Sequence, residues 1–119
     1  MRIVVSGIGG VGMAHICAAG RLGLEVVGLI DTSSSILSKA KQRWVNQWGD
    51  YQEEVEVQPN TIYSEDIREL SKLQLTDQDL IIIATPPHTH KALIRICLDF
   101  SKARILVEKP ISNDDYKMW

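Results

Sequence analysis

The sequence predicts an α/β fold in which one parallel β-sheet carries helices on both faces. Short apolar runs rich in β-branched residues alternate along the chain with segments of helical periodicity. The first run, residues 2–6, leads into the glycine-rich stretch 7–12 and then into a helical segment. With 119 residues, 45% of them hydrophobic, the chain has the size and apolar content of one domain. These observations predict a single, doubly wound domain.

Composition and charge exclude several classes of protein. The 13 basic and 15 acidic residues give a net charge of −2 with no block of like charge, so no nucleic-acid or membrane-surface partner is expected. The longest apolar run, residues 80–84, is far shorter than the roughly 20 residues that cross a bilayer. Cys17 and Cys97 stand alone in helical segments, and no signal-peptide pattern precedes the first strand. We therefore expect a reduced, cytoplasmic setting.

The glycine-rich stretch has the pattern GxGxxG between a strand and a helix. Gly7 permits a tight turn, Gly9 lets the backbone approach a phosphate, and Gly12 lets the helix lie close to the strand. The helix then offers unpaired N–H groups and the positive end of its dipole to an anion. A flexible turn without a ligand can have the same pattern, so its placement is what matters. The placement predicts a Rossmann-type pyrophosphate site formed by Gly7, Ile8, Gly9, Gly10, Val11 and Gly12.

A helix is expected over residues 11–22, where Ala14, Ala18 and Leu22 recur at four-residue spacing beside other small residues. Such a helix can approach a sheet closely. His15 lies in this helix, and a packing or solvent role is favoured there over chemistry. No metal site is predicted, because no histidine or cysteine stands at ligand spacing from His15.

The second strand, residues 25–30, ends on Asp31, about 20 positions after the glycines, where a carboxylate can bind the hydroxyls of an adenosine ribose. The alternative is that Asp31 caps the next helix, but any of the hydroxyl residues 32–35 can supply that cap. A carboxylate at this place repels a 2′-phosphate, which favours NAD over NADP. The hydroxyl groups of residues 32–35 weaken that preference, because hydroxyls can bond a phosphate.

In the middle of the chain, the sequence allows more than one assignment of secondary structure. One amphipathic helix is predicted over residues 34–48, with its sheet-facing side formed by Leu37, Ala40, Trp44 and Trp48. Residues 55–57 and 61–63 then compete for the third strand, and both can be strands. Ser64 is expected to cap a short helix with Glu65 and Asp66 in its first turn.

The most hydrophobic run, residues 79–84, predicts a central fourth strand that ends at Pro86 and Pro87. A helix follows, with Leu93, Ile96, Cys97 and Phe100 on its apolar face, and then a fifth strand over residues 104–107. In an open parallel sheet, ligands bind beyond the carboxyl ends of the strands. The residues after the fourth and fifth strands are therefore expected to face the same crevice as the glycines.

The segments GIGGVGMAH, TPPHTH and EKP, together with Asp31, resemble the Gfo/Idh/MocA oxidoreductases over essentially the whole chain. The resemblance implies hydride transfer between a nicotinamide cofactor and a sugar, cyclitol or related polyol. It implies that Thr85, Pro86 and His90 lie along the nicotinamide half of the cofactor and that Glu108 lies near the nicotinamide ribose. It also implies that Lys109 is catalytic, polarising the substrate hydroxyl or moving its proton.

Members of that family continue into a second, α+β domain that carries the substrate pocket, whereas this sequence ends on Trp119 in what looks like the start of a helix. The chain, residues 1–119, is therefore expected to be the dinucleotide-binding domain of a longer oxidoreductase, inactive by itself. Homo-oligomers are possible. The alternative is a stand-alone NAD-binding regulatory or sensing module without catalysis.

Overall fold

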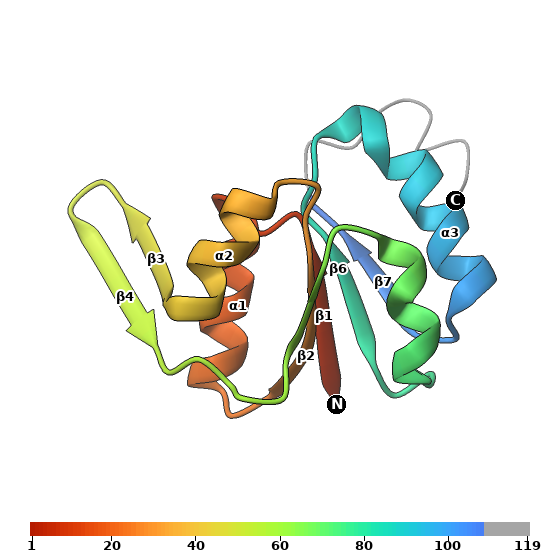
Figure 1. The fold of residues 1–119 in the computed structure, drawn as a ribbon, viewed down its shortest axis with the longest axis horizontal. Coiled ribbons are helices and arrows are strands. Elements are labelled where there is room, and N and C mark those ends of the chain that lie inside the picture. Colours follow the sequence, from red (N-terminus) through yellow and green to blue (C-terminus); the bar gives the residue numbers. More distant parts are fainter. Residues whose placement is uncertain (109–119) are drawn as a thin grey trace.

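The computed structural model describes residues 1–108. Its main sheet has five parallel strands in the order β5-β2-β1-β6-β7. The strands are β1 (Arg2–Ser6), β2 (Glu25–Ile30), β5 (Ile62–Ser64), β6 (Leu80–Ile83) and β7 (Arg104–Val107). The chain moves outward from β1 through β2 to β5 and then crosses back to place β6 on the other side of β1 (Figure 1). Strand order thus reverses between β1 and β6, where doubly wound sheets bind ligands. The predicted fold class is confirmed.

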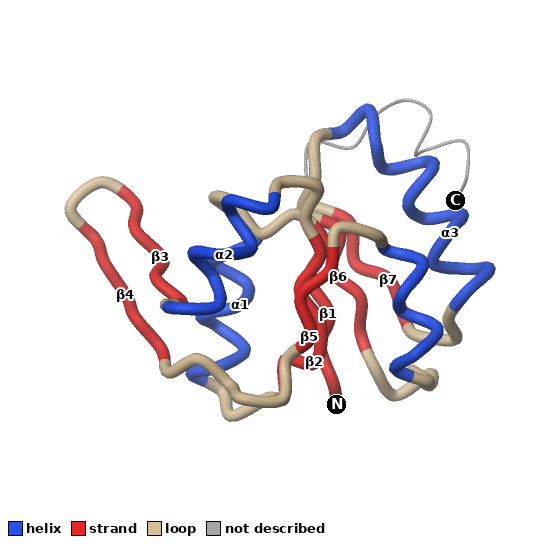
Figure 2. Tube along the Cα trace, in the orientation of Figure 1, coloured by secondary structure: helices blue, strands red, loops and turns tan. Residues whose placement is uncertain are grey.

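Helices cover both faces of this sheet. Figure 2 shows α1 (Val11–Arg21) and α2 (Ser34–Gln42) on one side, with the 3-10 helix η1 (Ile67–Leu73) and α3 (His90–Phe100) on the other. A short 3-10 turn, η2 (Pro87–Thr89), precedes α3. Alternate residues of the central strands join the two cores: Val5 packs with α1 and α2, whereas Val4 packs with η1 and α3. Because both faces are buried, the strands are continuous apolar runs.

The single helix predicted over residues 34–48 is wrong. Helix α2 ends at Gln42, the backbone becomes extended at Arg43, and the chain then forms an antiparallel ribbon of β3 (Trp44–Trp48) and β4 (Tyr51–Val55). This ribbon lies outside α1, away from the main sheet (Figure 2). Trp44 is fully buried there, while Trp48 is 84% exposed. The tryptophans therefore do not both pack on the sheet.

The two candidates for the third strand have separate places. Residues 62–64 form β5 and pair with β2 through Gly28 and Ile62, whereas Val55 ends the outer ribbon. Ser64 is the last residue of β5 and not the helix cap. The cap of η1 is Asp66, whose side chain accepts a hydrogen bond from the Arg68 N–H at 2.9 Å. Glu65 and Asp66 thus precede the helix, because Ser64 Oγ accepts from the Asp66 N–H and turns the chain first.

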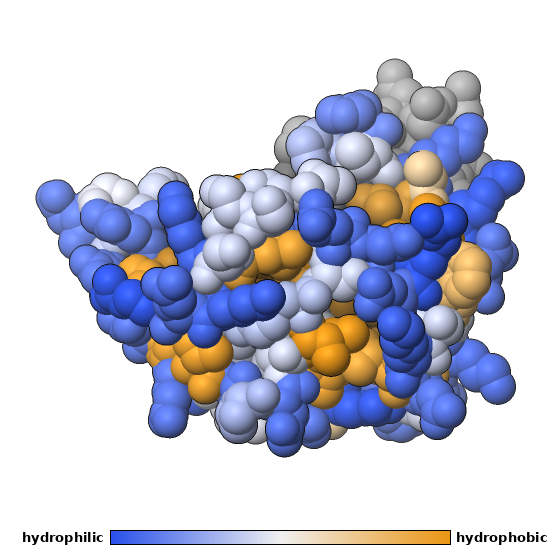
Figure 3. Space-filling model, viewed as in Figure 1, coloured by the Kyte–Doolittle hydropathy of each residue, from blue (hydrophilic) through white to orange (hydrophobic). Residues whose placement is uncertain are grey.

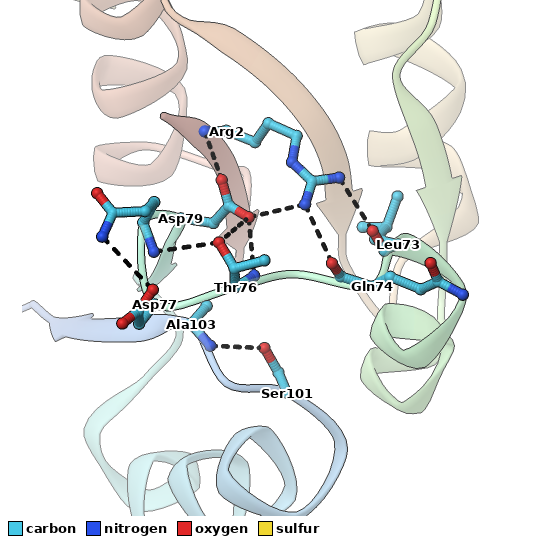
Figure 4. Close-up of polar contacts among 9 residues, drawn as sticks. Arg2, Leu73, Gln74, Thr76, Asp77, Asp79, Ser101 and Ala103 are labelled. Atoms are coloured by element: carbon cyan, nitrogen blue, oxygen red, sulfur yellow. Dashed lines mark hydrogen bonds and ion pairs between the residues drawn. The ribbon is translucent and has the colours of Figure 1, made fainter.

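The amino-terminal edge of the sheet is joined by an ion pair between Arg2 and Asp79 (Figure 4). The Asp79 side chain is buried and accepts from the Arg2 guanidinium at 2.8 Å and from the Thr76 N–H at 2.9 Å. The guanidinium also donates to the carbonyl oxygens of Leu73 and Gln74. This network lies at the opposite edge from the strand ends that carry the predicted site residues, so its role is structural.

Asp79 predicts a loss of stability in acid. Burial by itself raises the pKa of Asp79, but hydrogen bonds from Thr76 and Arg2 outweigh it and lower the pKa from 3.8 to about 2. The stabilisation is therefore complete above pH 3.8 and is lost as the pH falls through about 2, amounting to about 2.5 kcal/mol. Urea unfolding at several pH values should show this acid-dependent loss in wild type and in the exposed control Asp77→Asn. The loss should be smaller in Asp79→Asn, and equal pH dependence in all three proteins would contradict the assignment.

The surface in the view of Figure 3 is mostly hydrophilic, with apolar residues in small separate patches. Across residues 1–108, no helix has the length and hydropathy needed to span a membrane.

Burial raises the pKa of the Cys17 thiol and raises the pKa of the Cys97 thiol to about 12. Neither cysteine is therefore a thiolate nucleophile at neutral pH.

Candidate functional site

The glycine turn connects β1 to α1 at the point where the strand order reverses. Gly7 has a φ of +86°, and a Cβ built there would lie 2.8 Å from backbone atoms of Ala84 and Thr85. A Cβ at Gly12 would lie 1.7 Å from the Gly7 carbonyl oxygen. These contacts leave no space for a side chain, so the close approach of the segment after β6 requires glycine at position 7, and the close packing of α1 on the turn requires glycine at position 12.

The outer side of the turn is open. The nearest atom to a Cβ built at Gly9 is Ile36 Cδ1 at 3.8 Å, and Gly10 has a φ of +56° with open space in front of it. Among the described residues, no side chain caps the N-terminus of α1, and its first turn contains no acidic residue. The positive end of the helix dipole is thus available to an anion beside Gly9.

Asp31 connects the end of β2 to the glycine turn. Its Oδ2 accepts from the Ile8 N–H at 3.0 Å, and its Oδ1 accepts from the Ser33 N–H at 2.9 Å. The cap of α2 is Ser33, whose Oγ accepts from the Ile36 N–H at 3.3 Å. Asp31 is therefore not the helix cap, and its carboxylate is held beside the turn.

Backbone hydrogen bonds align the strand ends on one rim. The Gly7 N–H donates to the Ile30 carbonyl at 2.8 Å, and the Ala84 N–H donates to the Ser6 carbonyl at 2.8 Å. On the far side of β6, the Glu108 N–H donates to the Ile83 carbonyl at 2.9 Å. The segments after β1, β2, β6 and β7 consequently meet at the carboxyl edge of the sheet.

A cleft of about 750 Å³ runs along this rim. It brings together five of the residues predicted for the site, which are Gly7, Gly9, Asp31, Thr85 and Pro86. Sequence reasoning missed other residues that line it, namely Thr32, Ile36, Glu65, Asp66, Ile67, His88 and Leu93. Ile36, Ile67 and Leu93 occupy first turns of helices that follow strands. Their position in the sequence could have indicated them as cleft residues, because the first turn of a helix that follows a strand faces the same rim.

Six other predicted residues are not among those that line the cleft, which are Ile8, Gly10, Val11 and Gly12 of the glycine stretch together with His90 and Glu108. Ile8 is buried in the core beneath the turn, and Gly12 is buried against Gly7. Gly10 and Val11 are exposed at the start of α1. Lys109, the predicted catalytic residue, lies outside the described residues. Within residues 1–108, no three histidine, cysteine or acidic side chains are grouped as metal ligands.

The turn after β6 is built by hydroxyl groups and a buried histidine. Thr85 Oγ1 and Thr89 Oγ1 are 2.6 Å apart, and Thr89 Oγ1 donates to the Pro86 carbonyl at 2.7 Å. His90 is buried, and its Nε2 donates to the Thr85 carbonyl at 2.9 Å. His90 thus lies behind the turn that presents Thr85 and Pro86 to the cleft.

His15 contacts Glu108, and no pattern in the sequence indicates this contact. Its Nε2 lies 2.5 Å from Glu108 Oε1, and the two side chains are 25% and 30% exposed. The expected packing or solvent role of His15 therefore does not include its contact with the Glu108 carboxylate. The two residues are 93 positions apart, so no local pattern indicates the contact.

These features define a dinucleotide-binding α/β domain, because a glycine turn, a carboxylate at the next strand end and an open cleft meet at the switch point. The chain belongs to the Gfo/Idh/MocA family, described as an oxidoreductase family with an NAD-binding Rossmann fold, whose model matches residues 1–118. The suspected family is confirmed. NAD is accordingly the cofactor class of this fold.

Two solved structures are similar to the chain, both of the WlbA (WbpB) dehydrogenase from Thermus thermophilus. One is in complex with NAD and UDP-GlcNAcA, and the other is in complex with NAD and alpha-ketoglutarate. Each shares 19% identity over 93% of this chain, with a TM-score of 0.62, which supports the fold. The chain spans about a third of the length of those structures, 33% in each case. No curated protein matches the sequence.

Proposed function

We propose that this chain binds NAD across the carboxyl edge of its sheet and holds the nicotinamide for hydride transfer to or from a sugar, cyclitol or related polyol. The observation that carries the proposal is the placement of Asp31 beside an open, uncapped glycine turn. The substrate class comes from the family resemblance. A second domain is proposed to supply the substrate pocket, since the chain spans about a third of the similar structures.

The residues on the rim fit the cofactor. The open side of Gly9 and the dipole of α1 suit a pyrophosphate. Each carboxylate oxygen of Asp31 accepts one backbone N–H, and a carboxylate has about four acceptor sites. Asp31 can therefore accept hydrogen bonds from ribose hydroxyls without losing its contacts to the turn. Bound NAD supplies the hydride acceptor, and the chain supplies orientation and electrostatics.

The charges along the cleft favour NAD over NADP. Asp31, Glu65 and Asp66 all line it, and no lysine or arginine is among its lining residues within the described part of the chain. Asp66 is paired with the Arg68 guanidinium at 2.8 Å, so this pair adds no net charge and the negative charge of the cleft comes from Asp31 and Glu65. A 2′-phosphate in this cleft would meet negative charge, and among the described residues that line the cleft there is no cation to compensate it.

Calorimetric titration of the chain with NADH and NADPH tests this proposal. We expect the wild type to bind NADH more tightly than NADPH. We expect Asp31→Asn to lower the affinity for NADH about tenfold or more and to reduce the ratio of the NADH and NADPH affinities. Asp77→Asn, at the opposite edge of the sheet, is the matched control and should leave both affinities unchanged. Equal or tighter binding of NADPH by the wild type would contradict the NAD preference, and absence of binding to either would remove the proposed function.

The alternative proposal, a non-catalytic NAD-binding regulatory module, predicts the same titration. The two proposals differ in what they require of the EKP segment. Hydride transfer needs catalytic groups beside the nicotinamide, whereas a regulatory module needs none. Substrate-dependent reduction of NAD by the protein together with its substrate-binding domain would support the oxidoreductase. Loss of that activity on replacing Lys109 would assign the catalytic role to the residue that the resemblance implies.

A further inference from the structure

The β3–β4 ribbon has a free edge on each side, because within residues 1–108 its sheet contains only these two strands. Its turn has Gly49 at a φ of +58° between the cross-strand partners Trp48 and Tyr51. A two-residue turn of this kind makes Trp48 and Tyr51 a hydrogen-bonded pair, and non-hydrogen-bonded pairs alternate with hydrogen-bonded ones from there. The backbone N–H and C=O groups of Val45 and Gln47 therefore point away from β4, toward the free edge of β3.

The two edges differ in their protection against pairing with another strand. Native sheets usually protect an exposed edge with charged residues, proline or a bulge. Strand β4 carries Glu53 and Glu54, which form ion pairs with Arg21 and Arg43. Strand β3 has the sequence WVNQW, with no charged residue and no proline, and its register with β4 contains no shift. The free edge of β3 is therefore the unprotected one.

The space beside the β3 edge is open. Figure 2 shows α2 and β3 diverging from the point where the helix ends. A hollow of about 410 Å³ lies between them, lined by Ala40 of the helix and Val45 of the strand among others. At the other end of β3, Trp48 and Tyr51 are 84% and 55% exposed. Exposed aromatic side chains that lie together are typical of protein–protein contacts.

We propose that the free edge of β3 pairs antiparallel with β3 of a second copy of this chain, so that the two ribbons form one continuous sheet about a two-fold axis. Such a contact uses the same surface on both copies. With Asn46 at the centre, Val45 of one copy lies opposite Gln47 of the other, and their outward groups exchange both backbone hydrogen bonds. Trp44 then lies opposite Trp48 of the second copy, an aromatic pair of the kind that stabilises antiparallel strands.

Charge complementarity favours a second copy as the occupant of this edge. In this register Gly49 of one copy lies opposite Arg43 of the other, so Asp50 lies beside the basic end of α2. Lys39 belongs to that end and lines the hollow, and neither Asp50 nor Lys39 forms an ion pair within residues 1–108. Self-pairing of β4 about its centre would instead set Glu53 against Glu53 of the second copy, and like charges directly opposite are destabilising.

Two matched proline variants test the proposal by sedimentation equilibrium. Gln47 and Gln52 are cross-strand partners, and the N–H of each points outward, Gln47 at the β3 edge and Gln52 at the β4 edge. Proline at either position removes an outward donor and leaves the bonds between β3 and β4 intact. We expect the wild type and Gln52→Pro to dimerise with a dissociation constant of about 10–100 μM, as suits a small interface. Gln47→Pro should raise that constant more than about tenfold.

Charge reversal tests the two-fold register. Asp50→Lys and Lys39→Glu should each weaken the dimer about three- to tenfold, because each places like charges together. The double variant Asp50→Lys/Lys39→Glu should recover the wild-type dissociation constant, because it restores opposite charges across the contact. Asp77→Lys, at the amino-terminal edge of the main sheet, is the control and should leave dimerisation unchanged. Thermal unfolding at low protein concentration checks that each variant retains the fold.

Several results would overturn the inference. A wild-type chain that stays monomeric at about 500 μM would exclude a second copy as the occupant of the edge. A dimer that Gln52→Pro weakens as much as Gln47→Pro would not depend on the β3 edge, and a dimer that neither variant weakens would use another surface. Both proline variants should bind NADH like the wild type, because the ribbon lies away from Asp31 and the cleft. Loss of the dimer is therefore measured separately from loss of the proposed NAD site.

Discussion

Replacing Gly12 with alanine is expected to destabilise the domain by more than about 4 kcal/mol, a size that marks a backbone clash. The added methyl group would lie 1.7 Å from the Gly7 carbonyl oxygen, a backbone atom that cannot yield by a side-chain rotation. Relief requires α1 to move away from β1, which would open the core around Val5 and Ile16. Circular dichroism during urea unfolding measures the effect, and NADH binding should be lost with the fold.

Gly9→Ala is the matched comparison. A methyl group there has no neighbour closer than 3.8 Å, so we expect a change of less than about 0.5 kcal/mol in unfolding free energy. If a pyrophosphate occupies the open side of the turn, however, the methyl group excludes it, and NADH affinity should fall about tenfold or more. The pair of variants separates the glycine that the fold needs from the glycine that the ligand needs. Normal stability of Gly12→Ala would show that the turn is looser than its contacts indicate.

Replacing Trp44 with alanine is expected to lower the free energy of unfolding by about 3–5 kcal/mol. Trp44 is fully buried in the core beneath the β3–β4 ribbon. Its indole Nε1 donates to the Tyr63 hydroxyl at 3.3 Å, and that hydroxyl donates to the Ala40 carbonyl at 3.3 Å. The substitution therefore leaves a cavity and removes a hydrogen-bond donor.

Trp48→Ala is the control on the same ribbon. Trp48 is 84% exposed near the turn at Gly49, so its replacement should change the unfolding free energy by less than about 0.5 kcal/mol. A single helix over residues 34–48 would bury both tryptophans and predict similar losses. Urea unfolding of the two variants decides between these arrangements, and similar losses would contradict the ribbon.

The sequence pattern wrongly predicts a helix for residues 44–48, and the reason is physical. Residues four apart share one face of a helix and also share one face of a strand, because four is close to the helical period and is a multiple of the strand period. Trp44 and Trp48 therefore fit both structures. A ribbon forms where α1 offers a surface of small residues: a Cβ at Gly20 would lie 2.9 Å from Val55 Cγ2. The Arg21–Glu53 ion pair adds to this contact.

The sequence does not decide the position of the third strand, for a related reason. Residues 55–57 and 61–63 both favour strands, and local propensity cannot say which one pairs with β2. Thr61 Oγ1 donates to the Val26 carbonyl at 2.6 Å, and Ile62 pairs with Gly28 in the sheet. These contacts involve residues more than 30 positions apart, so only the folded chain contains the information.

The sequence by itself determined the parallel α/β fold, the glycine turn and the acidic residue at the end of β2. Each of these depends on interactions within a strand–turn–helix unit, where residue type and spacing are enough. The tertiary structure decided the outer ribbon, the apolar lining of the cleft by Ile36, Ile67 and Leu93, and the contact of His15 with Glu108. Those features depend on which segments, distant in the sequence, meet on one face of a helix or at the carboxyl edge of the sheet. The order of the strands in the sheet determines which segments meet.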